Sequence, residues 1–158
     1  MSKIVKSIVI NVPVSAAYNQ WTQFEQYPTF MTGIKEVRQL DDRHLLWRVE
    51  IFGRTEEWET EITEQVADQR IVWRYTQGAR NAGRVTFHPL SSAKTVVTLQ
   101  MGYDPEGLLE KFGDKLGLIE KRVENDLEEF KRFIESRNDP TGAWRGELPK
   151  TDASPGQA

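Results

Sequence analysis

The chain has 158 residues, of which 38% are hydrophobic, 28% charged and 10% aromatic, and its formal net charge is −3. This composition is typical of one globular domain and excludes a disordered chain; without a surplus of basic residues we expect no nucleic-acid partner. The absence of cysteine excludes disulfides, a thiol nucleophile and a cysteine metal site, which fits a reducing compartment.

The first predicted element is a β-strand over residues 3–12, KIVKSIVINV, which is rich in β-branched residues. Ser7, Asn11 and the following Pro13 break its apolar stretch, so a strand explains this segment better than an export signal does. No stretch of the chain approaches the roughly 20 apolar residues that cross a membrane. We therefore predict a cytoplasmic protein without a membrane span.

Two short helical segments are predicted next. Over residues 13–24, PVSAAYNQWTQF, helical spacing gathers apolar side chains on one face. The residues of this face are Val14, Ala17, Tyr18 and Trp21. The second segment, residues 24–33, is rich in aromatic residues, is interrupted by Pro28 and ends at Gly33, a residue typical of helix ends.

From Ile34 to Asp104 the spacing changes from helical to alternating, which predicts an antiparallel sheet of about six or seven strands with one apolar and one solvated face. One stretch of it, EEWETEITE (Glu56 to Glu64), contains five glutamates. In an extended strand Trp58, Thr60 and Ile62 point to one face, and the glutamates between them point to the other. These carboxylates could be catalysts, metal ligands or the wet side of a strand.

Arginines on the neighbouring strands favour the third interpretation, the solvated side of a strand. Arg48 and Arg74 fall on the same outward face as the glutamates, so we expect cross-strand ion pairs and interpret the carboxylates as a solvated face. His44 lies in a turn and His88 on the outward face, so they form neither a catalytic pair nor a metal site. No cofactor motif is present, and we predict no catalytic residue, no metal and no cofactor.

The inward polar groups are expected to be mainly hydroxyls, with almost no inward group that is charged at neutral pH. They belong to Thr60, Tyr75, Thr95 and Tyr103. Such hydroxyls orient a carbonyl or a phenol but titrate far from neutral pH. This composition favours binding over proton transfer.

A long helix is predicted after DPEG, with Asp104 as its cap and Pro105 at its first position, ending near Arg137. Its apolar stripe covers the inner face of the sheet. The stripe consists of Leu109, Phe112, Leu116, Val123, Leu127, Phe130 and Ile134. Gly113 and Gly117 each cost about 1 kcal/mol relative to alanine, which indicates a helix break, close packing or a deformable lid.

The last residues, 138–158, are rich in proline, glycine, serine and aspartate and lack periodicity. We therefore predict a domain over residues 1–137 and a flexible tail over residues 138–158. Trp144 is the exception within the tail, since a lone tryptophan either docks on its own domain or contacts a partner protein.

The order of these elements resembles the helix-grip fold of the START-like superfamily, and within it the polyketide cyclase/dehydrase family, which includes coenzyme-Q-binding START-like proteins. The segments that carry the resemblance are VPVSAAYNQWTQFEQYPTFM (12–31), WETEI (58–62), RIVWR (70–74), GRVTFHPL (83–90), TVVTLQMGYDPEG (95–107) and DLEEFKRFIE (126–135). The resemblance implies an α+β domain in which a curved antiparallel sheet grips the long helix around a hydrophobic cavity.

On this resemblance, the inward residues become candidates for the cavity lining and for ligand contacts. They are Trp21, Tyr27, Phe30, Met31, Trp47, Trp58, Thr60, Trp73, Tyr75, Phe87, Met101, Tyr103, Phe112 and Leu116. Inward aromatic residues also form the core of any antiparallel protein, so each of them has a purely structural alternative.

Three functions are compatible with this sequence. The first is a carrier or sensor of a lipophilic small molecule such as a lipid, a quinone or a polyketide. The second is a polyketide-type aromatase/cyclase, which needs an acid or a base directed into the cavity. The third is a protein-interaction or stress-response module whose partner binds the tail near Trp144. The near absence of inward ionisable groups favours the first, and favours a protein that is not an enzyme over one that is.

Overall fold

The computed structural model describes residues 2–51, 53–76, 82–103, 116–137 and 139–150. Within these residues it contains a seven-stranded antiparallel sheet, two short helices after the first strand, and a long C-terminal helix. The elements in chain order are β1 (Ser2–Ile10), α1 (Val14–Trp21), the 3₁₀-helix η1 (Phe24–Thr29), β2 (Ile34–Gln39), β3 (His44–Ile51), β4 (Arg54–Val66), β5 (Arg70–Tyr75), β6 (Ala82–Ser91), β7 (Lys94–Tyr103) and α3 (Leu116–Arg137). The predicted fold class is therefore confirmed.

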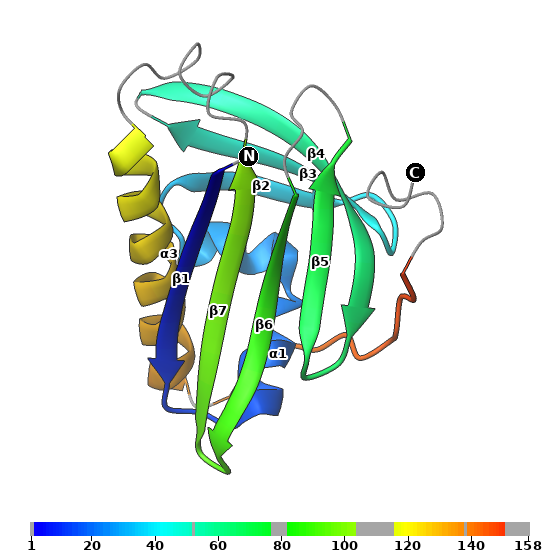
Figure 1. Ribbon diagram of the computed structural model, residues 1–158, viewed down its shortest axis with the longest axis vertical. Helices are drawn as coiled ribbons and strands as arrows, with labels where there is room; N and C mark the ends of the chain where they lie inside the picture. Colours follow the sequence, from blue (N-terminus) through cyan, green and yellow to red (C-terminus); the bar gives the residue numbers. More distant parts are fainter. Residues whose placement is uncertain (1, 52, 77–81, 104–115, 138, 151–158) are drawn as a thin grey trace.

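The strands follow the order β1-β7-β6-β5-β4-β3-β2, so only the β1–β7 pairing joins strands distant in sequence. Figure 1 shows the sheet curling, with β3 and β4 crossing the upper part of the molecule above the upright strands β1, β7 and β6. A register shift between Ile62 and Glu64 bends β4, as β-bulges do. Ile62 and Thr63 are consequently both buried.

Pro13 marks the start of α1 shortly after β1. Pro13 has φ −60°, close to the helical value, and its carbonyl oxygen accepts hydrogen bonds from the backbone of Ala16 and Ala17. Helix α1 buries Ala17, Tyr18, Gln20 and Trp21 against the sheet. The predicted interruption at Pro28 lies inside η1, where a 3₁₀ turn accommodates it.

The outward face of β3, β4 and β5 carries the predicted ion pairs. Arg48 lies directly opposite Glu57 in the ladder, with Nε 3.5 Å from Oε2. Arg74 lies opposite Glu61, with Nη2 2.6 Å from Oε1. Glu57 and Glu61 therefore belong to a charged outer face, as the sequence predicted. Glu56 lies opposite the inward Val49 in the ladder and is 11% exposed.

Helix α3 lies alongside β1 and covers the concave side of the sheet (Figure 1). Four predicted stripe residues, Val123, Leu127, Phe130 and Ile134, are buried in the core. The predicted helix start, Asp104 and Pro105, lies outside the described residues, as do Leu109, Phe112 and Gly113. Leu116 is the first residue of α3, and its side chain is not described. None of the described helices is long and apolar enough to cross a membrane.

Residues 139–150 lie against the domain as an extended segment. Leu148 forms an isolated antiparallel bridge with Gln65 of β4, and its side chain is buried. Trp144 packs against the core cluster, and its backbone N–H donates to Thr22 Oγ1 at 3.1 Å. Docking of Trp144 on its own domain was one of the two expectations for it. The domain limit at residue 137 and a flexible tail over residues 138–158 remain predictions.

Candidate functional site

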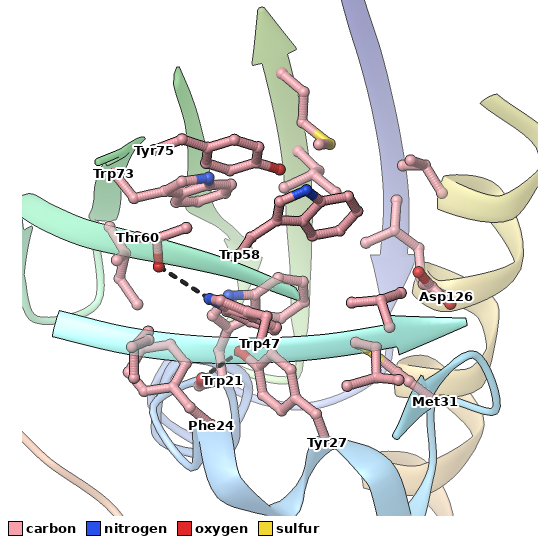
Figure 2. A pocket seen from close by; sticks show the side chains of 18 of the residues that line it. Trp21, Phe24, Tyr27, Met31, Trp47, Trp58, Thr60, Trp73, Tyr75 and Asp126 are labelled. Carbon is pink, nitrogen blue, oxygen red and sulfur yellow. Dashed lines mark hydrogen bonds between the residues drawn. The ribbon is translucent and has the colours of Figure 1, made fainter. Parts of the chain in front are cut away.

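A cavity of about 220 Å³ lies between the curled sheet, the short helices and α3. Its walls are almost entirely apolar and strongly aromatic, and Figure 2 shows indole and phenol rings converging on it from the sheet and the short helices. The lining residues are Trp21, Phe24, Tyr27, Met31, Ile34, Leu45, Trp47, Val49, Trp58, Thr60, Ile62, Ile71, Trp73, Tyr75, Leu99, Met101, Arg122, Val123, Asp126 and Leu127.

Nine of the fourteen predicted site residues line this cavity. They are Trp21, Tyr27, Met31, Trp47, Trp58, Thr60, Trp73, Tyr75 and Met101. Those from the sheet were placed by strand alternation, which separates the inner from the outer face of a strand. Their role as ligand contacts remains a prediction.

Phe30 and Phe87 do not line the cavity, which corrects the expected lining. The ring of Phe30 stacks on Phe133 of α3, with centroids 4.4 Å apart. The ring of Phe87 packs edge-on against Tyr18 of α1, with centroids 5.3 Å apart, and is buried in the core. Phe112 lies outside the described residues, as do the side chains of Tyr103 and Leu116.

Hydrogen bonds fix two of the aromatic side chains in the wall. The indole N–H of Trp47 donates to Thr60 Oγ1 at 2.9 Å, and the Tyr27 hydroxyl donates to the carbonyl oxygen of Trp21 at 2.6 Å. Both bonds are drawn in Figure 2. Burial raises the pKa of Tyr27 well above its ordinary value, so its hydroxyl stays protonated. These groups hold the shape of the cavity.

Tyr75 differs from them because its hydroxyl has no hydrogen-bond partner among the described residues, although its ring stacks on Trp58 with centroids 5.8 Å apart. Burial raises the pKa of Tyr75 to about 12. The hydroxyl therefore offers a hydrogen bond to a bound molecule at neutral pH but is a poor acid.

Two ionisable residues that the sequence analysis missed, Arg122 and Asp126, also line the cavity from α3. From the sequence we expected almost no inward ionisable group, and these two were not among the predicted site residues. Arg122 Nη1 donates to the carbonyl oxygen of Glu50 at 2.6 Å, and the guanidinium lies so close to Gly33 that a Cβ atom there would collide with it. Helical spacing could have indicated both residues. Asp126 lies three positions after the buried Val123, and Arg122 lies four positions before Asp126, so the two are neighbours on the helix surface.

Burial raises the pKa of the Asp126 carboxyl to about 6, because the charged form is poorly solvated. The positive charge of Arg122 opposes this rise, and the negative charge of Glu129 adds to it. Arg122 Nε lies 3.9 Å from Asp126 Oδ2, which is too far for a hydrogen bond. Asp126 is thus a carboxyl group that changes its protonation state near neutral pH.

The two histidines lie away from the cavity lining. His44 Nδ1 lies 2.9 Å from Asp41 Oδ1 at the start of β3, and His88 is exposed on β6. No group of three or more His, Cys, Asp or Glu residues suited to a metal ion occurs in the described part of the chain. The arrangement can bind an apolar molecule, orient it by hydrogen bonds, and offer it one carboxyl group.

Comparison with known proteins gives a consistent result. The family model described as "Polyketide cyclase / dehydrase and lipid transport" matches residues 10–132. An uncharacterized 17.2 kDa protein from the melC2-rnhH intergenic region of Streptomyces lincolnensis is 48% identical over 147 residues, which cover 92% of this chain and 98% of that protein.

Solved structures show the same arrangement of elements. A crystal structure from Deinococcus radiodurans matches with a TM-score of 0.65 and 28% identity, covering 86% of this chain and 99% of that chain. The Zhui aromatase/cyclase from Streptomyces sp. R1128 matches with a TM-score of 0.74 and 13% identity, covering 90% and 99%. A START superfamily protein from Mycobacterium smegmatis matches with a TM-score of 0.67 and 18% identity, covering 85% and 95%.

Proposed function

The chain belongs to the polyketide cyclase, dehydrase and lipid transport family, and from this premise we propose that it binds and carries a lipophilic small molecule in its cavity. Its fold is the START-like helix-grip fold. The observation that carries the proposal is the aromatic, almost wholly apolar wall between sheet and helix. Ligand sites of this kind are concave, apolar and supplied with a few polar groups.

The size of the cavity supports the proposal. An engineered cavity of roughly 150 Å³ in another protein stays dry and binds benzene. A space of about 220 Å³ lined by indole and phenol rings is larger than that and suits two or more fused rings, or a short folded chain. Lipids, quinones and polyketide-like compounds all supply such an apolar body.

A polyketide-type aromatase/cyclase is the second candidate function, and Asp126 favours it. A carboxyl whose pKa lies near 6 can give or take a proton near neutral pH, which general acid–base catalysis needs. Turnover of a linear poly-β-ketone thioester to a ringed product, lost in Asp126→Asn, would establish this activity. Carriage remains our first proposal because the described residues of the cavity wall offer a single carboxyl group.

The remaining predictions concern partners and location. A cytoplasmic location, the absence of a nucleic-acid partner, and a protein partner bound through the tail near Trp144 stay predictions. The packing of Trp144 against the core cluster favours a structural role for that residue over a partner contact. A pull-down with the full chain and with a chain ending at Arg137 would separate these two roles.

The test of ligand binding begins with native mass spectrometry of the purified protein and organic extraction of any molecule it retains. Binding is then measured by fluorescence with N-phenyl-1-naphthylamine, a neutral lipophilic probe. Val49→Phe should weaken probe binding at least about tenfold, because Val49 lines the cavity and a phenyl ring fills part of it. Val5→Phe is the matched control, since Val5 lies exposed on β1. An empty protein that fails to bind the probe would refute the proposal.

A further inference from the structure

A glycine lies in the sheet wall of the cavity, between two bulky side chains. Gly83 of β6 is opposite Trp73 of β5 and opposite Met101 of β7 in the two ladders. Trp73 and Met101 both line the cavity, so Gly83 is the middle residue of an inward-facing row. In the next inward row, β6 has Val85 at the corresponding position, and its side chain is fully buried. The wall therefore lacks a side chain at residue 83.

The indole of Trp73 occupies the space of the missing side chain. A Cβ atom at Gly83 would lie 2.6 Å from Cζ2 and 2.8 Å from Cε2 of that indole. Carbon atoms in contact are normally about 3.5–4.0 Å apart, so no side chain fits at residue 83 while the indole lies there. The backbone of Gly83 has no positive φ that would require glycine. Since glycine weakens a strand, the close approach of the indole is the physical reason for a glycine here.

The position of this indole determines how much room the cavity has. Figure 2 shows Trp73 on the wall opposite Asp126, and its indole lies between the backbone of β6 and the cavity. A side chain at residue 83 would push the ring away from β6 by roughly 1 Å, the difference between 2.6 Å and an ordinary carbon–carbon contact. The backbone of β6 blocks movement in the other direction. The displaced ring would therefore enter the cavity.

We propose that Gly83 determines the largest ligand that the cavity accepts, because it allows the indole of Trp73 to lie against β6. The inference rests on the proposed binding function and identifies a specificity-determining residue of that site. With the indole in its present position, the cavity of about 220 Å³ accepts an apolar body of three rings. With the indole displaced by a side chain at residue 83, the cavity accepts two rings at most.

The test compares two fluorescent probes of different size in the full-length protein. N-phenyl-1-naphthylamine has three aromatic rings and 2-naphthol has two. The wild type should bind both. Gly83→Ala should weaken binding of the larger probe at least about tenfold and that of 2-naphthol less than about threefold, since overpacking penalises the larger body first. Arg84→Ala is the matched control on the same strand, because Arg84 is exposed on the outer face and its loss should change neither affinity.

A second substitution separates the proposed role from a general effect on the strand. Trp73→Leu removes both of the indole carbons that a Cβ atom at Gly83 would meet. In the Trp73→Leu background, Gly83→Ala should therefore change the affinity for N-phenyl-1-naphthylamine less than about threefold. An effect of alanine on the backbone of β6 alone would be equally large in both backgrounds, because independent effects are additive.

The outcomes distinguish this inference from the proposed function. If neither probe binds the wild type, the proposed function itself fails. Binding of 2-naphthol without N-phenyl-1-naphthylamine by the wild type would overturn the size limit given to the cavity. Unchanged or tighter binding of the larger probe by Gly83→Ala would overturn the role of Gly83 and leave ligand binding intact. If Gly83→Ala binds neither probe, the Trp73→Leu background decides: restored binding supports the role, and continued loss overturns it.

Discussion

The concave side of the sheet contains two regions, and these regions differ in whether their buried polar groups have hydrogen-bond partners. In the packed region around α1, which contains Tyr18, Phe87, Phe130 and Ile134, the buried polar side chains are mostly paired, with Asp68 Oδ1 beside Arg145 as an exception. Examples are Gln20, Gln65 and Thr95, which are hydrogen-bonded to Thr141, Tyr18 and Val12. In the cavity region around β3, β4 and β5, Asp126, Arg122 and Tyr75 have polar atoms without a partner among the described residues.

This difference separates stability from binding. Paired polar groups and closely packed rings stabilise the fold, whereas unpaired polar groups beside an open space cost stability and are retained where a ligand uses them. The packed region is therefore expected to respond to truncation with loss of stability. The cavity region is expected to respond with altered binding and little loss of stability.

The largest effect should come from truncating a ring in the packed region. Phe130→Ala should lower the free energy of unfolding by about 3–5 kcal/mol, because Phe130 is fully buried and packs on Trp21 with centroids 4.8 Å apart. Met101→Ala, which enlarges an existing cavity, should cost about 2 kcal/mol or less. Urea unfolding of both variants measures the difference. Equal losses would show that the two regions are packed alike.

The second effect concerns the buried charge of the cavity region. The folded-state pKa of Asp126, about 6, lies above its ordinary value of 3.8, so the folded state holds this proton more tightly than the unfolded state. Ionisation of Asp126 therefore destabilises the fold as pH rises from about 4 to about 6, by up to about 3 kcal/mol at 1.36 kcal/mol for each pKa unit.

Asp126→Asn removes this charge with little change of shape. The variant should be more stable than the wild type at pH 7, by up to about 3 kcal/mol, and the advantage should vanish near pH 4. Thermal unfolding across this pH range measures it. Glu128→Gln, which removes the same charge from the exposed side of α3, should show no such pH dependence. Equal stability of Asp126→Asn and wild type at pH 7 would contradict the prediction.

A matched pair of hydroxyl deletions sharpens the comparison further. Tyr18→Phe removes the oxygen that accepts a hydrogen bond from Gln65 Nε2 at 2.9 Å, so it leaves a buried amide unpaired and should cost about 1–3 kcal/mol. Tyr75→Phe removes a hydroxyl that has no partner among the described residues and should change stability by less than about 0.5 kcal/mol. Chemical denaturation of both variants measures these changes in the free energy of unfolding. A larger cost for Tyr75→Phe would mean that its hydroxyl is paired in the folded protein.

Strand alternation predicted the sheet, its two faces and most of the cavity wall, because the side-chain period of a strand is fixed by backbone geometry. It could not separate the packed region from the cavity region. Phe87 and Trp73 both point inward, yet Phe87 meets Tyr18 of α1 while Trp73 meets open space. Which of these happens depends on where α1 and α3 cross the sheet, and strand parity carries no such information.

Three other features could not be predicted from the pattern of apolar residues. The bulge after Ile62 reverses the alternation of β4 and buries Gln65, which a regular strand would point outward. Asp126 was missed because the stripe of α3 was read from its apolar members alone. Residues 139–150 lack apolar periodicity and are held largely through hydrogen bonds such as that between Thr141 N–H and Gln20 Oε1, at 2.8 Å.

The smallest effects are expected on the outer face, where the sequence prediction was most complete. Glu57 and Arg48 are 58% and 49% exposed and 3.5 Å apart, so Glu57→Gln should change the free energy of unfolding by less than about 0.5 kcal/mol. Glu61→Gln should cost more, up to about 1 kcal/mol, because Glu61 is 17% exposed and accepts a 2.8 Å hydrogen bond from Arg74 Nε. Neither should alter probe binding, since both side chains point away from the cavity. Weakened binding in either variant would show that the outer face shapes the site.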